Sequence, residues 1–174
     1  MPFLRLLLVI AIFYSSPFSG SAQPPGWTSL TYNKATLNYP NSWHVVRESR
    51  GQHTRVTMTP DSMQQLAMRM VTMYDVPTDE KHNFAFFKKN FSSILQPSIG
   101  SDGKILKTED ITFKGHDAIY AEVTADSLPI KVYYIDAGTD MYMVLVTQRR
   151  YSEVADPGLE RDGMGILNSI NFLK

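Results

Sequence analysis

Residues 35–46, ATLNYPNSWHVV, decide the fold more than any other stretch of this sequence. Leu37 and Tyr39 alternate with polar residues, which is the periodicity of a strand with one buried face. Residues 40–42 (PNS) break this strand, because proline lacks a backbone donor and asparagine and serine favour turns. A second strand begins at Trp43. We therefore expect two short strands joined at a tight corner, which open one continuous antiparallel scaffold.

Strand periodicity recurs along much of the chain. The predicted strands are 27–32, 35–39, 43–48, 54–59, 66–75, 104–113, 118–125, 128–135 and 141–148. Most of them are joined by turns that are too short for parallel crossovers, which indicates antiparallel pairing. The segment 141–148 is the most apolar of these strands, and we expect it at the centre of the sheet.

A first helix is predicted after residue 77. Thr78 is the expected N-cap, and the acids at 79–80 then lie in the first turn, where the helix dipole favours negative charge. Its apolar stripe comprises Phe84, Phe87, Phe91, Ile94 and Leu95. Pro97 and Gly100 are expected to end the helix.

A second helix is predicted near the end of the sequence. Asp156 is the expected N-cap and Pro157 the first helical residue. Gly163 and Gly165 each weaken a helix by about 1 kcal/mol relative to alanine, which indicates close packing on a sheet or a kinked start. The sequence thus predicts an α+β fold, an antiparallel sheet with two main helices packed on it.

The first 22 residues have the pattern of a secretory signal peptide. Arg5 gives a positive start, residues 6–13 are apolar, and small residues lead to an expected cleavage after Ala22. An uncleaved interfacial anchor is the alternative. A membrane-spanning helix needs about 20 apolar residues, more than this run or any later one supplies. We expect residues 23–174 to form a single extracytoplasmic domain, periplasmic or secreted, that does not span a membrane.

The composition excludes several classes of site. The 174 residues contain no cysteine, so disulfides and thiolate zinc sites are excluded. The 17 basic and 17 acidic residues balance, and no stretch is strongly basic. Nucleic-acid binding needs a concentrated basic face, and we therefore do not expect it.

Three short motifs, in order along the chain, carry a resemblance to a known family. They are residues 35–43, residues 111–118 (ITFKGHDA) with their single turn glycine, and residues 166–172 (ILNSINF). Together they resemble the PsbP-like fold family, which includes the photosystem II extrinsic protein PsbP, the nuclear Ran-binding Mog protein and bacterial periplasmic DcrB-type proteins. The resemblance covers residues 27–174 and implies an α+β fold. It implies no function, because these relatives do unrelated jobs on one scaffold; the periplasmic members are closest in compartment.

The four histidines show no metal-binding motif. His44, His53, His82 and His116 have neither i, i+4 spacing on a helix nor an HExxH motif. We expect His116 to face solvent, and His44 to lie on the strand face opposite Trp43. A metal site built from sequence-distant residues stays an alternative. Manganese and calcium are associated with PsbP proteins, but no ligand set matches here residue by residue.

Nine methionines is a high count for this length. Those near three of the predicted strands are Met58, Met63, Met68, Met70, Met73, Met141 and Met143. Thioethers are soft ligands for Cu(I), which makes a copper carrier one alternative. Core packing is the preferred interpretation, because pairs of these residues share a strand face and methionine fills irregular cores.

No motif predicts catalysis. The chain has no GxSxG elbow, and Ser42 is near a histidine only in sequence, which is not triad geometry. The carboxylate pairs at 79–80 and 109–110 are expected to be solvated. We predict no catalytic residue, no enzyme activity, no cofactor and no metal ligand set.

The remaining candidates are surface residues. Phe86 falls off the apolar stripe of the first helix, on a face with Lys89 and Asn90, and an exposed phenylalanine can anchor a partner. Residues 149–151 (RRY) are expected in a solvated loop, from which an anionic partner could be contacted.

The leading prediction is a non-enzymatic binding or assembly accessory for another envelope or secreted protein, with its binding residues left open. It expects an exposed apolar patch that includes Phe86 or Tyr151, and no deep polar pocket. The alternative is a small-ligand or metal-binding protein, which expects a sizeable cavity lined by methionine and tyrosine. An enzyme, the third hypothesis, expects His44, His53 or His116 within hydrogen-bond reach of an acid.

Overall fold

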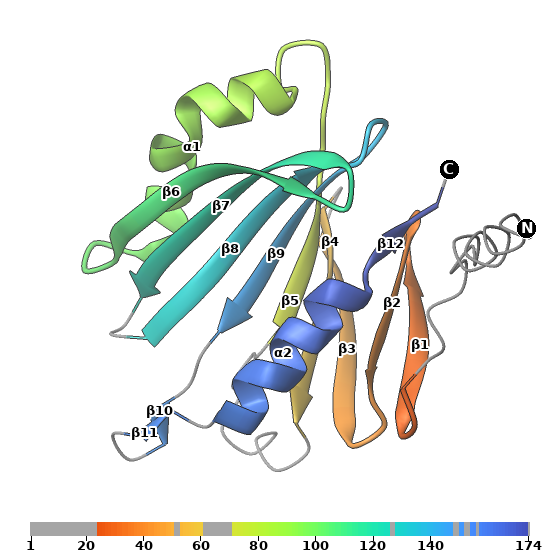
Figure 1. The fold of residues 1–174 in the computed structure, drawn as a ribbon. Coiled ribbons are helices and arrows are strands. Elements are labelled where there is room, and N and C mark those ends of the chain that lie inside the picture. The colour runs from red at the N-terminus through yellow and green to blue at the C-terminus, as the bar shows by residue number, and fades with distance from the viewer. Residues whose placement is uncertain are drawn as a thin grey trace, which may run out of the picture.

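The computed structural model describes residues 24–50, 53–60, 71–125, 128–147, 150–151, 154–155 and 157–173. They form a seven-stranded sheet, a three-stranded sheet, a two-stranded ribbon and two helices (Figure 1). All the strand pairs are antiparallel. The α+β class predicted from the sequence is confirmed. The expected signal peptide lies outside the described residues.

The large sheet has the strand order β3-β4-β5-β9-β8-β7-β6. Its strands are β3 (Trp43–Arg50), β4 (His53–Pro60), β5 (Val71–Val76), β6 (Lys104–Phe113), β7 (His116–Ala125), β8 (Leu128–Asp136) and β9 (Met141–Thr147). β9 occupies the middle of this order, as its apolar sequence predicts. Of the strand predicted over 66–75, the structure describes the part from Val71 onward, and the strand continues to Val76.

The small sheet has the order β1-β2-β12. Its strands are β1 (Trp27–Tyr32), β2 (Ala35–Pro40) and β12 (Asn171–Phe172), and a separate ribbon pairs β10 (Arg150–Tyr151) with β11 (Val154–Ala155). The corner at residues 41–42 carries the chain from β2 in the small sheet to β3 in the large one. The expectation of one continuous scaffold is therefore wrong, because alternation marks a buried face but not the sheet to which a strand belongs. Leu37 and Trp43, on either side of the corner, are buried in the same core.

The two helices cover opposite faces of the large sheet. Phe91, Leu95 and Ile99 of α1 (Phe84–Ile99) pack on β7, β8 and the start of β9. On the other face, α2 (Pro157–Ser169) and the small sheet pack over β9, β5, β4 and β3. Figure 1 shows the two helices at different ends of the large sheet, with α1 beside β6 and α2 over β9 and β5. None of the described helices is both long and apolar enough to cross a membrane.

The start of α1 differs from the sequence prediction. Asn83 is the N-cap, and its side chain accepts a hydrogen bond from the Phe86 backbone N at 3.1 Å. Thr78 and the acids at 79–80 therefore precede the helix, whose first turn contains no acid. Pro97 lies inside the helix rather than at its end. Inside a helix a proline removes one backbone hydrogen bond and crowds the carbonyl four residues earlier, and this helix ends two residues after Pro97.

The glycines of α2 allow close packing, as the sequence predicts. A Cβ on Gly163 would lie 3.1 Å from Cγ1 of Val146 in β9 and 3.6 Å from Cγ2 of Val71 in β5. A Cβ on Gly165 would lie 2.8 Å from Cη2 of Trp27 in β1. The backbone of α2 thus lies directly against both sheets. This close contact explains why two glycines occur in α2 despite their low helix propensity.

Candidate functional site

The turn that precedes α1 is organised by one carboxylate. Oδ1 of Asp79 accepts hydrogen bonds from the backbone N of Lys81 at 2.8 Å and of His82 at 2.6 Å. The His82 ring also donates through Nδ1 to Oδ2 of Asp79 at 2.9 Å. These bonds from His82 lower the pKa of the Asp79 carboxyl. The turn is therefore closed on itself and presents the imidazole at the surface.

Phe86 projects from the first turn of α1 and keeps 36% of its surface exposed. Its ring meets the His82 ring edge to face at 5.0 Å and the Phe87 ring at 5.7 Å, both nearly perpendicular. Phe87 stacks on Tyr134 of β8 at 5.8 Å, and Phe91 meets the same tyrosine at 5.4 Å. We call these five side chains the aromatic row. It runs from the surface into the core and fixes the exposed ring from two sides.

Tyr134 is the buried end of the aromatic row. It is 4% exposed. Burial raises the pKa of its hydroxyl to about 12, so the side chain is neutral at physiological pH. The row is therefore anchored by an uncharged, well-packed group on the central part of the large sheet.

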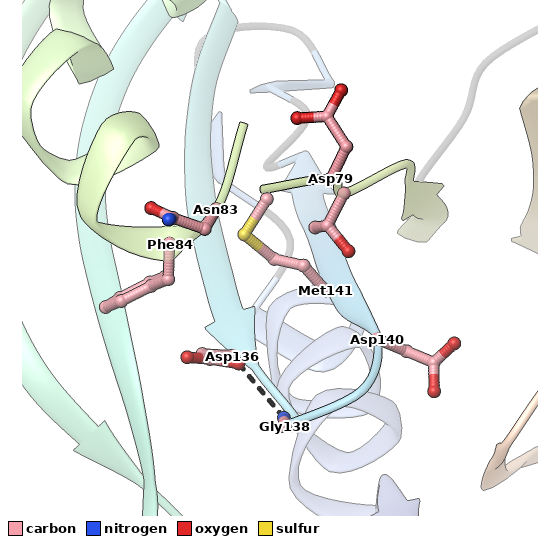
Figure 2. Close-up of a pocket in the computed structure, with 8 residues that line it drawn as sticks. Asp79, Asn83, Phe84, Asp136, Gly138, Asp140 and Met141 are labelled. Atoms are coloured by element: carbon pink, nitrogen blue, oxygen red, sulfur yellow. Dashed lines mark hydrogen bonds between the residues drawn. The ribbon is translucent and has the colours of Figure 1, made fainter. Parts of the chain in front are cut away.

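A shallow hollow of about 250 Å³ lies beside the aromatic row (Figure 2). It is lined by Thr78, Asp79, Asn83, Phe84, Asp136, Gly138, Asp140 and Met141. The turn before α1 supplies one side and the loop between β8 and β9 the other. Small-molecule sites usually enclose about 300–1,000 Å³ and are mainly apolar, so this hollow is small and polar by comparison.

The carboxylates around the hollow have separate partners. Oδ1 of Asp136 accepts a hydrogen bond from the Gly138 backbone N at 3.0 Å. Asp140 accepts from Thr139 Oγ1 at 2.6 Å and from Lys34 Nζ at 3.0 Å, and these bonds lower the pKa of its carboxyl. In Figure 2 the Asp140 carboxylate points away from the Asn83 side of the hollow. Accordingly, no three histidine or carboxylate side chains of the described part of the chain are close enough to hold a metal ion.

The histidines named by the enzyme hypothesis are dispersed. His44 is exposed on β3. His116 does not face solvent as expected: it is half-buried, its Nδ1 donates to the Asp136 backbone O at 3.1 Å, and its ring contacts Phe172 at 5.0 Å. The side chain of His53 lies outside the described residues. Among the described residues, His82 instead forms a close and exposed histidine–carboxylate pair with Asp79.

The methionines that the structure describes on the sheet pack mainly in its cores. Met58 and Met73 are fully buried on the face covered by α2, and Met141 is 1% exposed on the face covered by α1. Because they lie on opposite faces of the sheet, these sulfurs do not converge. Met63, Met68 and Met70 lie outside the described residues.

Sequence reasoning identified part of this surface and missed the rest. Phe86 was found because it falls off the helical stripe, and its exposure is confirmed. The Asp79–His82 pair was missed, although an i, i+3 spacing of acid and histidine before a helix is a usable signal. The hollow joins segments that are distant in sequence, and no local pattern predicts it. Residues 150–151, expected in a loop, form β10 instead. Residue 149 and the side chains of residues 150–151 lie outside the described residues.

Comparison with known proteins was made at the level of sequence and of structure. No protein-family model and no curated protein matches the sequence. The structure is similar to the solution structure of cyanobacterial PsbP (CyanoP) from Synechocystis sp. PCC 6803, with a TM-score of 0.58, 10% identity, and coverage of 88% of this chain and 96% of that one. The chain has the PsbP-like fold. This confirms the resemblance carried by residues 35–43, 111–118 and 166–172.

A second similar structure is PA94 from Pseudomonas aeruginosa, a protein of unknown function. It has a TM-score of 0.46 and 13% identity, and the match covers 82% of this chain and 94% of that one. At 10% identity, the property that this chain shares with CyanoP is the fold, which hosts unrelated functions. The function must therefore be inferred from the residues of this chain.

Proposed function

We propose that this protein is a non-enzymatic accessory that binds another envelope or secreted protein through the exposed end of the aromatic row. The observation that carries the proposal is Phe86, a large apolar ring that is 36% exposed and held between His82 and Phe87. A fixed aromatic side chain loses little conformational entropy when a partner covers it, which is why such residues dominate binding energies.

The hollow beside the turn that precedes α1 supports this proposal over a small-ligand protein. A ligand site was expected to be a sizeable cavity lined by methionine and tyrosine, but the hollow contains one methionine and no tyrosine. Its carboxylates are engaged by Lys34, His82 and backbone N–H groups. A shallow polar hollow next to an apolar ring is typical of the rim and core of a protein interface.

The proposed location is outside the cytoplasm, after removal of residues 1–22. The support is the order of the N-terminal sequence: Arg5, an apolar run over 6–13, and small residues ending at Ala22. N-terminal sequencing of the protein recovered from an envelope fraction tests it directly. A mature chain that starts at Gln23 supports the proposal, and an intact Met1 start contradicts it.

Site-specific photo-crosslinking tests the binding proposal. A photoreactive residue is placed at Phe86 and, as a control at another exposed apolar side chain, at Leu106, which is 61% exposed on the edge strand β6. We expect one discrete crosslinked protein from position 86 in the envelope of the source cell and none from position 106. Phe86→Ser should then reduce native co-purification of that protein by at least about tenfold, as loss of an interface anchor does, while Leu106→Ser leaves it unchanged. Equal yields from the two positions would refute the assignment.

A further inference from the structure

β1 is an outer strand of the small sheet, with β2 on one side (Figure 1). The turn between them has two residues, 33–34, so Tyr32 and Ala35 form the closing hydrogen-bonded pair. Hydrogen bonding alternates along an antiparallel ladder, and every second residue therefore directs its N–H and C=O away from the partner strand. On β1 these outward residues are Trp27, Ser29 and Thr31, and the Trp27 N–H is already bonded to the Pro24 backbone O at 3.1 Å.

Arg47 of β3 provides independent support for this register. Its Nη2 donates to the Thr31 backbone O at 2.9 Å, so this carbonyl faces away from β2. Arg47 has no acidic partner among the described residues, and its guanidinium is exposed. One backbone acceptor of the edge is thus occupied by an exposed side chain, whose positive charge has no acidic partner among the described residues.

The edges of the two sheets differ in how they are protected. Natural proteins discourage strand addition with charges, bulges or prolines on edge strands. β6 has a bulge between Ile105 and Lys107 and further charges such as Glu109. β3 carries Arg47 and Glu48. β1, with the sequence WTSLTY, has no charge, no proline and an unbroken register with β2.

We propose that the β1 edge binds an extended segment of a partner protein as an added antiparallel strand, a contact separate from the one proposed at Phe86. Backbone hydrogen bonds give affinity in such contacts, and alternate side chains give specificity. Leu30 and Tyr32 are buried on the inner face of β1, whereas Ser29 and Thr31 are exposed on the outer face. The fitting segment therefore alternates apolar and polar residues.

Charge complementarity specifies one further residue of that segment. In an antiparallel arrangement the N-terminal half of the added strand lies opposite Thr31, and an acidic residue there pairs with Arg47. A second copy of this chain fits less well. Self-pairing about Leu30 would bring the Arg47 side chains of both copies to one short edge, where like charges repel.

The test uses synthetic peptides and protein expressed from the full chain. The probe is a labelled peptide of about eight residues, a typical strand length, with alternating threonine and valine and an aspartate near its N-terminus. A matched peptide carries lysine at the aspartate position. Binding is measured by fluorescence anisotropy, and amide hydrogen exchange of Ser29 and Thr31 is measured with and without peptide. We expect the aspartate peptide to bind at least about tenfold more tightly than the lysine peptide, and both amides to become protected.

Point variants test whether the peptide binds at the β1 edge or elsewhere on the surface. Ser29→Pro removes an outward N–H and should weaken binding at least about tenfold, whereas Ser29→Ala, which loses only the side-chain bond to Asn38, should not. Thr112→Pro is the matched control, since Thr112 is an outward residue of the β6 edge next to the two-residue turn at 114–115. Arg47→Glu should reverse the charge preference, so that the lysine peptide binds more tightly than the aspartate peptide, and it leaves the sequence of β1 unchanged.

Four outcomes would overturn the proposal. They are absence of binding at about 1 mM aspartate peptide, unchanged exchange at Ser29 and Thr31 in the complex, equal affinity of the Ser29→Pro and Ser29→Ala proteins, and unchanged peptide preference in Arg47→Glu. A dimer of the free protein that Ser29→Pro dissociates would assign the edge to a second copy instead. Because Phe86 is untouched in all these variants, failure here is distinguishable from failure of the crosslinking experiment.

Discussion

Replacing Gly165 by alanine tests how α2 is held between the two sheets. The new Cβ would lie 2.8 Å from Cη2 and 3.5 Å from Cζ2 of Trp27, and real Cβ atoms essentially never approach a neighbour within 3.0 Å. The half-buried indole must therefore move, and overpacking of this kind costs about 1–3 kcal/mol. Alanine also favours the helix interior by about 1 kcal/mol over glycine. We expect a net loss of about 1 kcal/mol in the free energy of unfolding, the middle of the range that these two effects allow.

Urea denaturation followed by far-ultraviolet circular dichroism measures this loss. A double-mutant cycle with Trp27→Leu isolates its cause, because the smaller side chain removes the ring from the Gly165 backbone. In that background Gly165→Ala should become stabilising by up to about 1 kcal/mol, the helix preference alone. Gly163→Ala is the control: its Cβ would meet Val146 at 3.1 Å and no atom of the indole within 4 Å, so its effect should be the same in both backgrounds.

If Gly165→Ala stabilises the protein with Trp27 in place, the indole does not pack on the helix, and the close contact between β1 and α2 is refuted. If the alanine is destabilising but the Trp27→Leu background does not relieve it, the cost arises elsewhere in the helix.

Three further predictions concern the start of α1, the hollow and the buried tyrosine. Asn83→Ala should lower the free energy of unfolding by about 1 kcal/mol, because it removes the N-cap of α1, while Thr78→Ala should change it by less than about 0.5 kcal/mol. Equal losses for the two variants in urea denaturation would instead support Thr78 as the N-cap. The hydrogen bond from Thr139, together with Lys34, lowers the pKa of the Asp140 carboxyl. The stability that this carboxylate contributes is therefore present above the unfolded pKa of about 4 and is lost as the pH falls through the folded pKa. Asp140→Asn should therefore narrow the stability difference between about pH 7 and pH 3, and parallel pH profiles would contradict this. Burial raises the pKa of Tyr134 to about 12. The stability gained from the neutral hydroxyl is therefore complete below the unfolded pKa of about 10 and is lost between about pH 10 and pH 12. Tyr134→Phe should make the free energy of unfolding less dependent on pH in this range.

The strands were predictable because a buried face imposes alternation on each of them. Leu37, Val56 and Val144 are buried one residue away from more exposed neighbours, and β9 shows its central place by being apolar throughout. The glycines of α2 likewise signal close packing, since glycine in a helix interior needs a reason. These are local constraints, and local sequence records them.

The assignment of strands to two sheets was not predictable from the same pattern. Leu37 and Trp43 face one core from different sheets, and alternation is identical in both cases. The start of α1 was ambiguous for a similar reason: Thr78 and Asn83 are both good caps, and the choice depends on Asp79 closing its own turn. Of the candidate site, the exposed phenylalanine follows from helical spacing, whereas the hollow requires the β8–β9 loop to meet the turn before α1.

The pairing of β12 with β2 has a consequence for when the protein can fold. The Asn38 backbone is bonded to the Ser169 side chain across 131 residues of sequence, and β5 takes its second neighbour from β9. Contacts between such distant residues form slowly, because a long loop must close before they contribute any stability. A chain with this topology cannot complete either sheet while its later segments are still being synthesised. It therefore remains incompletely folded until almost the whole chain has been synthesised.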